Sequence, residues 1–166
     1  MRSIQILFCL IVVSTAVAKA QFTKAELQVS GLNCSLCSKT TVKELSALEF
    51  VSDVKTDLMH NIYILTFKSE TPVNFDEISK IVHNESFFVS SLRATVNFNN
   101  VKVTDKSFTS HGDTYQVINK TDKPLEGEMT LLLIDKGFAP KSVSKKYLGQ
   151  VADGSPTNGK VYHVAI

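Results

Sequence analysis

Hydrophobic and polar positions change period several times between residues 25 and 98, which predicts strands interleaved with helices. Period-two alternation predicts strands at residues 25–29, 54–58, 62–67 and 88–96. Spacings of three and four predict a helix from about residue 35 to 48, with an inner face of Leu36, Thr40, Thr41, Leu45 and Leu48. With a second helix before the last strand, the order is βαββαβ. This order indicates an α+β, ferredoxin-like sandwich in which two helices cover one face of a sheet.

The second helix has the clearest start signal in the chain. Asn74 is placed as its N-cap, and Glu77 three residues later predicts a capping box. Val73 is spaced to pack against Ile78 as a hydrophobic staple. Its predicted inner face consists of Phe75, Ile78, Ile81 and Val82.

Residues 99–166 have a different texture and contain most of the glycines and prolines. Strands are predicted near residues 101–104, 114–118, 128–134 and 160–166. Pro140 and Gly149 bracket a short helix over residues 141–148. We therefore expect two domains, a ferredoxin-like domain over 21–98 and a small, mostly β domain over 99–166, either an OB-like barrel or a sandwich.

Residues 1–20 form a predicted signal peptide. Arg2 precedes an apolar run over residues 4–17, and Ala18 and Ala20 supply the small residues that a signal peptidase reads. Loss of Arg2 and Lys19 lowers the basic count from 18 to 16, which equals the acidic count of 16. We expect an exported, periplasmic or secreted monomer without a membrane span after cleavage. Its neutral charge gives no reason to expect nucleic-acid binding.

Removal of this segment takes away Cys9 and leaves one C-x-x-C pair, Cys34 and Cys37. The pair is placed where a strand passes through a loop into a helix N-terminus, whose dipole favours thiolate over thiol. Two thiolates are too few for a structural zinc site but suit a soft, two-coordinate ion. We expect Cu(I) at Cys34 and Cys37, with Hg(II), Ag(I) or Zn(II) as alternatives.

With this cysteine pair, residues 25–98 resemble the heavy-metal-associated domain family. The family pattern G-M-x-C-x-x-C is met by Gly31, Cys34 and Cys37, and three downstream positions match at Leu45, Val51 and Val54. The departures from the pattern are Leu32, Thr41, Phe50 and Ser86. Family members include copper chaperones, copper ATPase repeats and mercury-binding proteins. The resemblance therefore implies a metal-donating or metal-accepting partner, such as a metal-transporting ATPase.

The resemblance also implies an aromatic side chain near the metal loop. Phe87 or Phe88 is suitably placed, just before the last strand of the predicted sandwich. The sequence does not choose between them.

Two other interpretations of the cysteine pair stay open. C-x-x-C is also the motif of thiol–disulfide oxidoreductases, although the residues around this pair differ from the usual redox pattern. The pair could also form an inert local bridge in a structural or partner-binding envelope protein, in which residues 99–166 do the recognition. No motif of a hydrolase or a phosphate-binding enzyme is present, so we expect no enzyme.

Other chemistry-bearing side chains carry weaker signals. Lys39 is placed to offset the charge of a bis-thiolate site, and Lys141–Lys146 form a basic run that suits either a docking patch or a solvated helix face. Met59 beside His60 offers a soft donor pair, which we expect at the end of the fold opposite the cysteines. The histidines are spaced for surface or hydrogen-bonded roles rather than for a metal site, and they are His60, His83, His111 and His163.

Overall fold

The structure is a computed structural model that describes residues 20–31, 35–99, 106–119, 125–148 and 159–166. Its first part contains β1 (Gln21–Ser30), α1 (Ser35–Ser46), β2 (Val51–Asp57), β3 (Ile62–Phe67), α2 (Phe75–Asn84) and β4 (Phe88–Asn97). The predicted βαββαβ order and the α+β class are therefore confirmed. β1 pairs antiparallel with both β3 and β4, and β2 pairs with β3.

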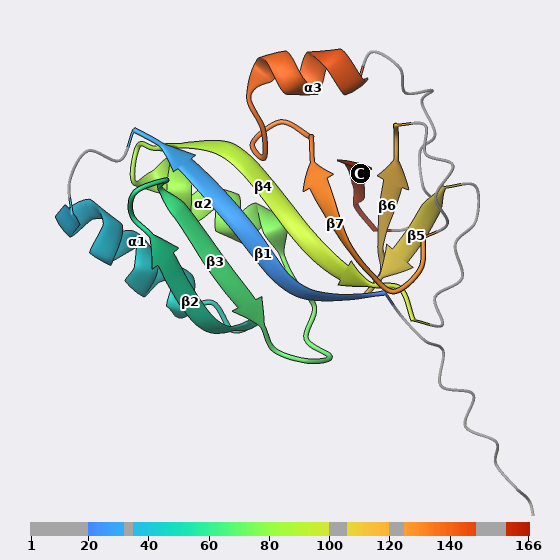
Figure 1. The fold of residues 1–166 in the computed structure, drawn as a ribbon, viewed down its shortest axis with the longest axis horizontal. Helices are drawn as coiled ribbons and strands as arrows, with labels where there is room; N and C mark the ends of the chain where they lie inside the picture. The colour runs from blue at the N-terminus through green and yellow to red at the C-terminus, as the bar shows by residue number, and fades with distance from the viewer. Residues whose placement is uncertain (1–19, 32–34, 100–105, 120–124, 149–158) are drawn as a thin grey trace, which may run out of the picture.

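The second part adds β5 (Ser107–Ser110), β6 (Asp113–Val117), β7 (Glu128–Leu133), α3 (Lys141–Leu148) and β8 (Val161–Ala165). The eight strands of the described residues belong to one mixed sheet of order β2-β3-β1-β4-β7-β8-β6-β5. Among these described strands, β6 and β8 pair in parallel and the other neighbours pair antiparallel. Figure 1 shows β7 continuing the sheet beside β4, with α3 beyond the end of β7.

The expected barrel or sandwich for residues 99–166 is not confirmed, because the described strands of this region extend the first sheet. The predicted strand at 101–104 lies outside the described residues, and β5 follows it at a position that was not predicted. A domain boundary at residue 99 stays a prediction.

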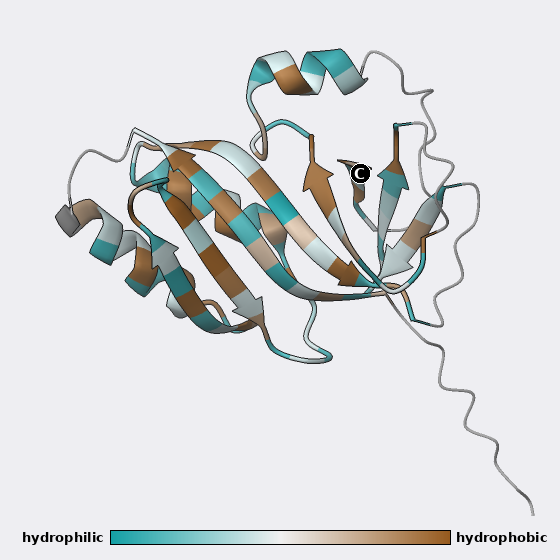
Figure 2. Cartoon of the chain, viewed as in Figure 1, coloured by the Kyte–Doolittle hydropathy of each residue, from teal (hydrophilic) through white to brown (hydrophobic). Residues whose placement is uncertain are grey.

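The two helices of the first part contact each other as well as the strands, and α2 lies behind β1 and β4 in the view of Figure 1. Strands β1 and β4 show alternating hydrophobic and hydrophilic bands in Figure 2, as expected for strands with one buried face. The N-cap prediction is confirmed, since the Asp76 N–H donates to the Asn74 side chain at 3.1 Å. Glu77 does not make the hydrogen bond of a capping box, in which it would accept from the Asn74 backbone N–H. It accepts instead from the Asn74 side-chain amide at 2.8 Å.

One aromatic cluster joins β1 and α2 to β6 and β8. Phe22 of β1 lies 4.9 Å, centroid to centroid, from both Phe75 of α2 and Tyr115 of β6. Tyr115 in turn stacks on Tyr162 of β8 at 5.2 Å. Residues on either side of position 99 therefore share one hydrophobic core.

Candidate functional site

The described residues on either side of the cysteine loop are the end of β1 and the first turn of α1. β1 ends at Ser30, Gly31 has a left-handed backbone with φ of 94°, and α1 begins at Ser35. A positive φ favours glycine, which explains the glycine at this exit from the strand. Leu32, Asn33 and Cys34 lie outside the described residues, so the structure does not test their predicted roles.

Cys37 is the third residue of α1 and is half-buried. It is disulfide-bonded, and the other two cysteines of the chain, Cys9 and Cys34, lie outside the described residues. The structure thus holds Cys37 in its oxidised form, whereas the sequence analysis expected a free thiolate. Metal binding by Cys34 and Cys37 stays a prediction.

The buried face of α1 next to Cys37 is more polar than predicted. Thr41 is completely buried, and its hydroxyl donates to the Cys37 carbonyl at 3.0 Å. Ser38 is also buried and accepts from the Tyr63 hydroxyl of β3 at 3.1 Å. Thr40 was expected on this face but is exposed. Each buried hydroxyl has a hydrogen-bond partner, which removes most of the cost of burying it.

Phe87 is the aromatic residue beside the start of the cysteine loop. Its Cδ1 atom lies 3.4 Å from the position that a Cβ on Gly31 would occupy, whereas Phe88 is 66% exposed. Ser86, immediately before it, has a left-handed φ of 64°. The resembled family has glycine at that position, and the observed backbone gives a physical reason for this preference.

The turn that carries Met59 and His60 lies at the same end of the sheet as the cysteine motif, contrary to our expectation. β3 is antiparallel to β1, so it begins where β1 ends. The Val29 N–H donates to the Asn61 carbonyl at 3.0 Å, which fixes this turn beside the last residues of β1. Met59 is 91% exposed there.

Each of the four histidines has its own hydrogen-bond partner, as expected for hydrogen-bonded roles. His83 donates from Nδ1 to the Ser79 carbonyl at 2.7 Å, and His111 contacts the Ser110 hydroxyl at 3.2 Å. Two histidines bond to carboxylates at 2.7 Å, in the pairs His60–Asp57 and His163–Asp135. The bond with His60 lowers the pKa of Asp57 below its ordinary value.

Within the described parts of the chain, no three His, Cys, Asp or Glu side chains form a cluster that could hold a metal ion.

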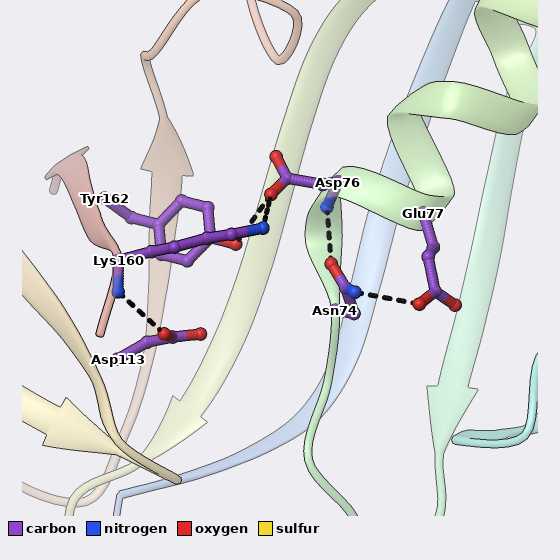
Figure 3. Close-up of polar contacts among 6 residues, drawn as sticks. All are labelled: Asn74, Asp76, Glu77, Asp113, Lys160 and Tyr162. Atoms are coloured by element: carbon purple, nitrogen blue, oxygen red, sulfur yellow. Dashed lines mark hydrogen bonds and ion pairs between the residues drawn. The ribbon is translucent and has the colours of Figure 1, made fainter. Parts of the chain in front are cut away.

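A polar cluster between α2 and β8 was missed by the sequence analysis (Figure 3). Asp76, in the first turn of α2, accepts from the Lys160 ammonium group and from the Tyr162 hydroxyl, the latter at 3.2 Å. The Lys160 N–H donates to Asp113 at 3.0 Å. Residues 76 and 160 are 84 positions apart, and no local sequence signal connects them. This cluster ties the last strand to the start of α2.

The described helices do not include one that is both long enough and apolar enough to cross a bilayer. No protein-family model matches the chain, and no curated protein matches it. Among solved structures, the chain is similar to two solution structures of the yeast copper transporter domain CCC2A in the apo and Cu(I)-loaded states. The identities are 31% and 30%, over 39% and 40% of this chain and 88% and 90% of the yeast domain, with a TM-score of 0.36 in both cases.

Proposed function

We propose that this chain is an exported protein that carries or sequesters Cu(I) through Cys34 and Cys37. The observation that supports this most directly is the position of Cys37, in the first turn of α1 after the left-handed turn at Gly31. A βαββαβ unit with a C-x-x-C motif at this junction presents two sulfurs at the positive end of a helix. Such a position favours their ionised form.

The chemistry of the pair favours a transferable soft ion. Thiolates prefer Cu(I), and two sulfur ligands leave the ion open to a third ligand from a partner. The partner's thiolate can then bind before the first Cu–S bond breaks. A metal-transporting ATPase or another metal-handling protein is the proposed donor or acceptor. Hg(II), Ag(I) and Zn(II) are the competing ions.

The disulfide at Cys37 sets a condition on this function. Reduction must add two electrons and two protons to the disulfide, and both thiols must then lose their protons to bind the metal. We therefore propose that only the reduced protein binds Cu(I). A cellular thiol reductant or a metal already in place would maintain that form.

An anaerobic Cu(I) titration of the reduced protein against a coloured Cu(I) chelator tests the proposal. We expect one tightly bound equivalent, and we expect the Cys34→Ser, Cys37→Ser variant to bind none. The Met59→Leu, His60→Gln variant is the matched control, because it removes the other soft donor pair at this end of the sheet. Equal binding by the wild type and the cysteine variant would contradict the proposal. Loss of binding in the Met59→Leu, His60→Gln control would indicate that the metal binds at the turn instead.

Thiol–disulfide exchange is the second candidate, and the disulfide bond of Cys37 is the observation that favours it. An exchange protein would accelerate the reduction of insulin by dithiothreitol. The Cys34→Ser, Cys37→Ser variant would lose that acceleration. Absence of acceleration by the wild type, together with one tight Cu(I) equivalent, would favour the metal function.

Export is proposed from the signal-peptide pattern of residues 1–20. Cleavage after Ala20 would remove a buried residue from the fold. It would also remove the carbonyl that accepts from the Ser110 hydroxyl at 2.6 Å. The intact mass of the protein recovered outside the cytoplasm shows whether the chain is cleaved and after which residue. Recovery of the uncleaved chain from the cytoplasm alone would contradict export.

A further inference from the structure

A groove of about 790 Å³ opens beside the end of β1 that leads to the cysteine motif. The first residues of β4 line one side, and the segment from Lys136 to Lys145 lines the other. Ser30 lies at the end nearest Gly31. A volume of this size lies within the range of about 300–1,000 Å³ that is typical of ligand-binding pockets.

The groove lies along a part of β4 that has no described neighbouring strand on the side away from β1. β4 pairs with β1 from Phe88 to Asn97, but it pairs with β7 only from Leu92 to Asn97. β7 ends at Leu133, and the chain then turns towards α3. In the described structure, β4 residues 88–91 thus have a neighbouring strand on one side only, and Phe88, Val89 and Ser90 line the groove. An unpaired strand edge presents backbone N–H and C=O groups that can pair with another chain.

The walls of the groove combine positive charge with apolar surface. Lys136, Lys141 and Lys145 line it and are exposed, and the described lining residues include no aspartate or glutamate. In the described parts of the chain, none of these three lysines forms an ion pair. Phe88, which is 66% exposed, and Pro140 supply apolar surface.

The wall formed by α3 is held in place by the fold. The Ser144 hydroxyl donates to the Ile134 carbonyl at 2.7 Å, which joins α3 to the end of β7. The Ser79 hydroxyl of α2 donates to the Gly137 carbonyl at 2.7 Å, which fixes the segment before α3. These two hydrogen bonds fix the wall formed by the segment from Lys136 to Lys145, and pairing with β1 fixes the β4 wall, so the groove does not need to form on binding.

We propose that this groove binds an extended, acidic segment of a partner protein, which adds to β4 as a strand beside residues 88–91. Strand addition satisfies the free backbone groups of β4 and aims alternate side chains of the segment at opposite faces. Carboxylates on the segment then meet the three lysines, and apolar side chains contact Phe88 and Pro140. None of the described residues that line the groove is a cysteine, and the binding argued for here uses backbone groups and lysines, so this proposal does not depend on metal binding.

The test uses a fluorescent eight-residue peptide that alternates glutamate and valine, with metal-free protein. We expect saturable binding at low ionic strength that weakens with added salt. The Lys136→Gln, Lys141→Gln, Lys145→Gln variant should weaken binding about tenfold or more. The matched control carries Lys24→Gln, Lys43→Gln and Lys55→Gln, which removes the same charge from exposed positions outside the groove, and it should bind as the wild type does.

A second peptide of the same sequence, with alternate backbone amides N-methylated, separates strand addition from simple charge attraction. It keeps every carboxylate but cannot donate the strand hydrogen bonds, so we expect its binding to be lost. Equal binding of both peptides, or equal weakening by both lysine variants, would overturn the proposal. Two other results would also overturn it: occupation of the groove by a small amphiphilic carboxylate such as decanoate with no peptide binding, or self-association of the protein through the groove, seen by sedimentation velocity.

Discussion

Gly31 and Ser86 both have left-handed backbones near the cysteine motif, but only the first is a glycine. A Cβ added at Gly31 would meet no closer atom than Phe87 Cδ1 at 3.4 Å, so the main cost of Gly31→Ala is backbone strain at φ of 94°. We expect this change to lower the free energy of unfolding by about 1–2 kcal/mol. Ser86→Gly relieves strain at φ of 64° and should raise the free energy of unfolding by up to about 1 kcal/mol. Urea unfolding of both variants measures the effect, and shifts in the same direction would contradict this assignment.

At this scale, the glycine turn after β1 and the start of α1 could be predicted, but the polar contacts of α1 could not. Gly31, Cys34 and Cys37 are local signals, since the required φ and the spacing of the sulfurs depend on a few consecutive residues. The polar contacts of α1 depend on distant residues instead. Ser38 is buried because the Tyr63 hydroxyl, 25 positions away, donates to it. Its burial could not be distinguished in the sequence from the exposure of Thr40.

At the scale of elements, the contact between α2 and β8 should make stability fall at alkaline pH. Burial raises the pKa of Tyr162 above its ordinary value of 10.0, and the hydrogen bond to Asp76 raises the pKa of Lys160 above 10.5. Above about pH 10, the unfolded chain therefore releases protons that the folded chain keeps. The stability that these groups contribute is fully present below about pH 10 and is lost as pH rises through their folded-state pKa values.

The Tyr162→Phe variant tests this linkage through its urea midpoint at pH 8 and at about pH 11. It should begin slightly below the wild type, because it lacks the 3.2 Å hydrogen bond to Asp76. Its midpoint should then fall less between the two pH values, because one of the three described groups with a raised pKa is gone, while Lys160 and Tyr115 remain. A decline parallel to that of the wild type would show that Tyr162 does not contribute to the alkaline loss.

The elements themselves were predicted well where periodicity and end signals are local. The predicted limits of β3 and α3 match the structure, and the predicted β4 ends one residue early. Strand pairing was harder, because the paired residues of β4 and β7 are 31 to 41 positions apart, from Asn97–Glu128 to Leu92–Leu133, and no local pattern encodes that contact. The turn at Met59 is different. The antiparallel order of β1 and β3 was enough to place it at the cysteine end of the sheet, so that error was avoidable.

At the scale of the whole molecule, one core connects the residues on both sides of position 99. Phe22 and Phe75 come from the first part, and they pack on Tyr115 of the second. The pairing of β4 with β7 adds a backbone connection across the same boundary. If residues 21–98 were separated from the rest, these aromatic faces and the β4 edge would be exposed to water, at a cost in apolar burial and hydrogen bonding.

This shared core predicts that the protein unfolds in a single cooperative step. Calorimetry should show one transition whose calorimetric and van't Hoff enthalpies agree. Tyr115→Ala removes a ring that is only 1% exposed and should lower the free energy of unfolding by about 3 kcal/mol. Hydrogen exchange should report the same loss of protection for slowly exchanging amides of β1 and of β6, because β1 carries Phe22, which contacts the deleted ring. Two transitions, with the effect of Tyr115→Ala confined to β5–β8, would instead establish separate domains with a boundary near residue 99.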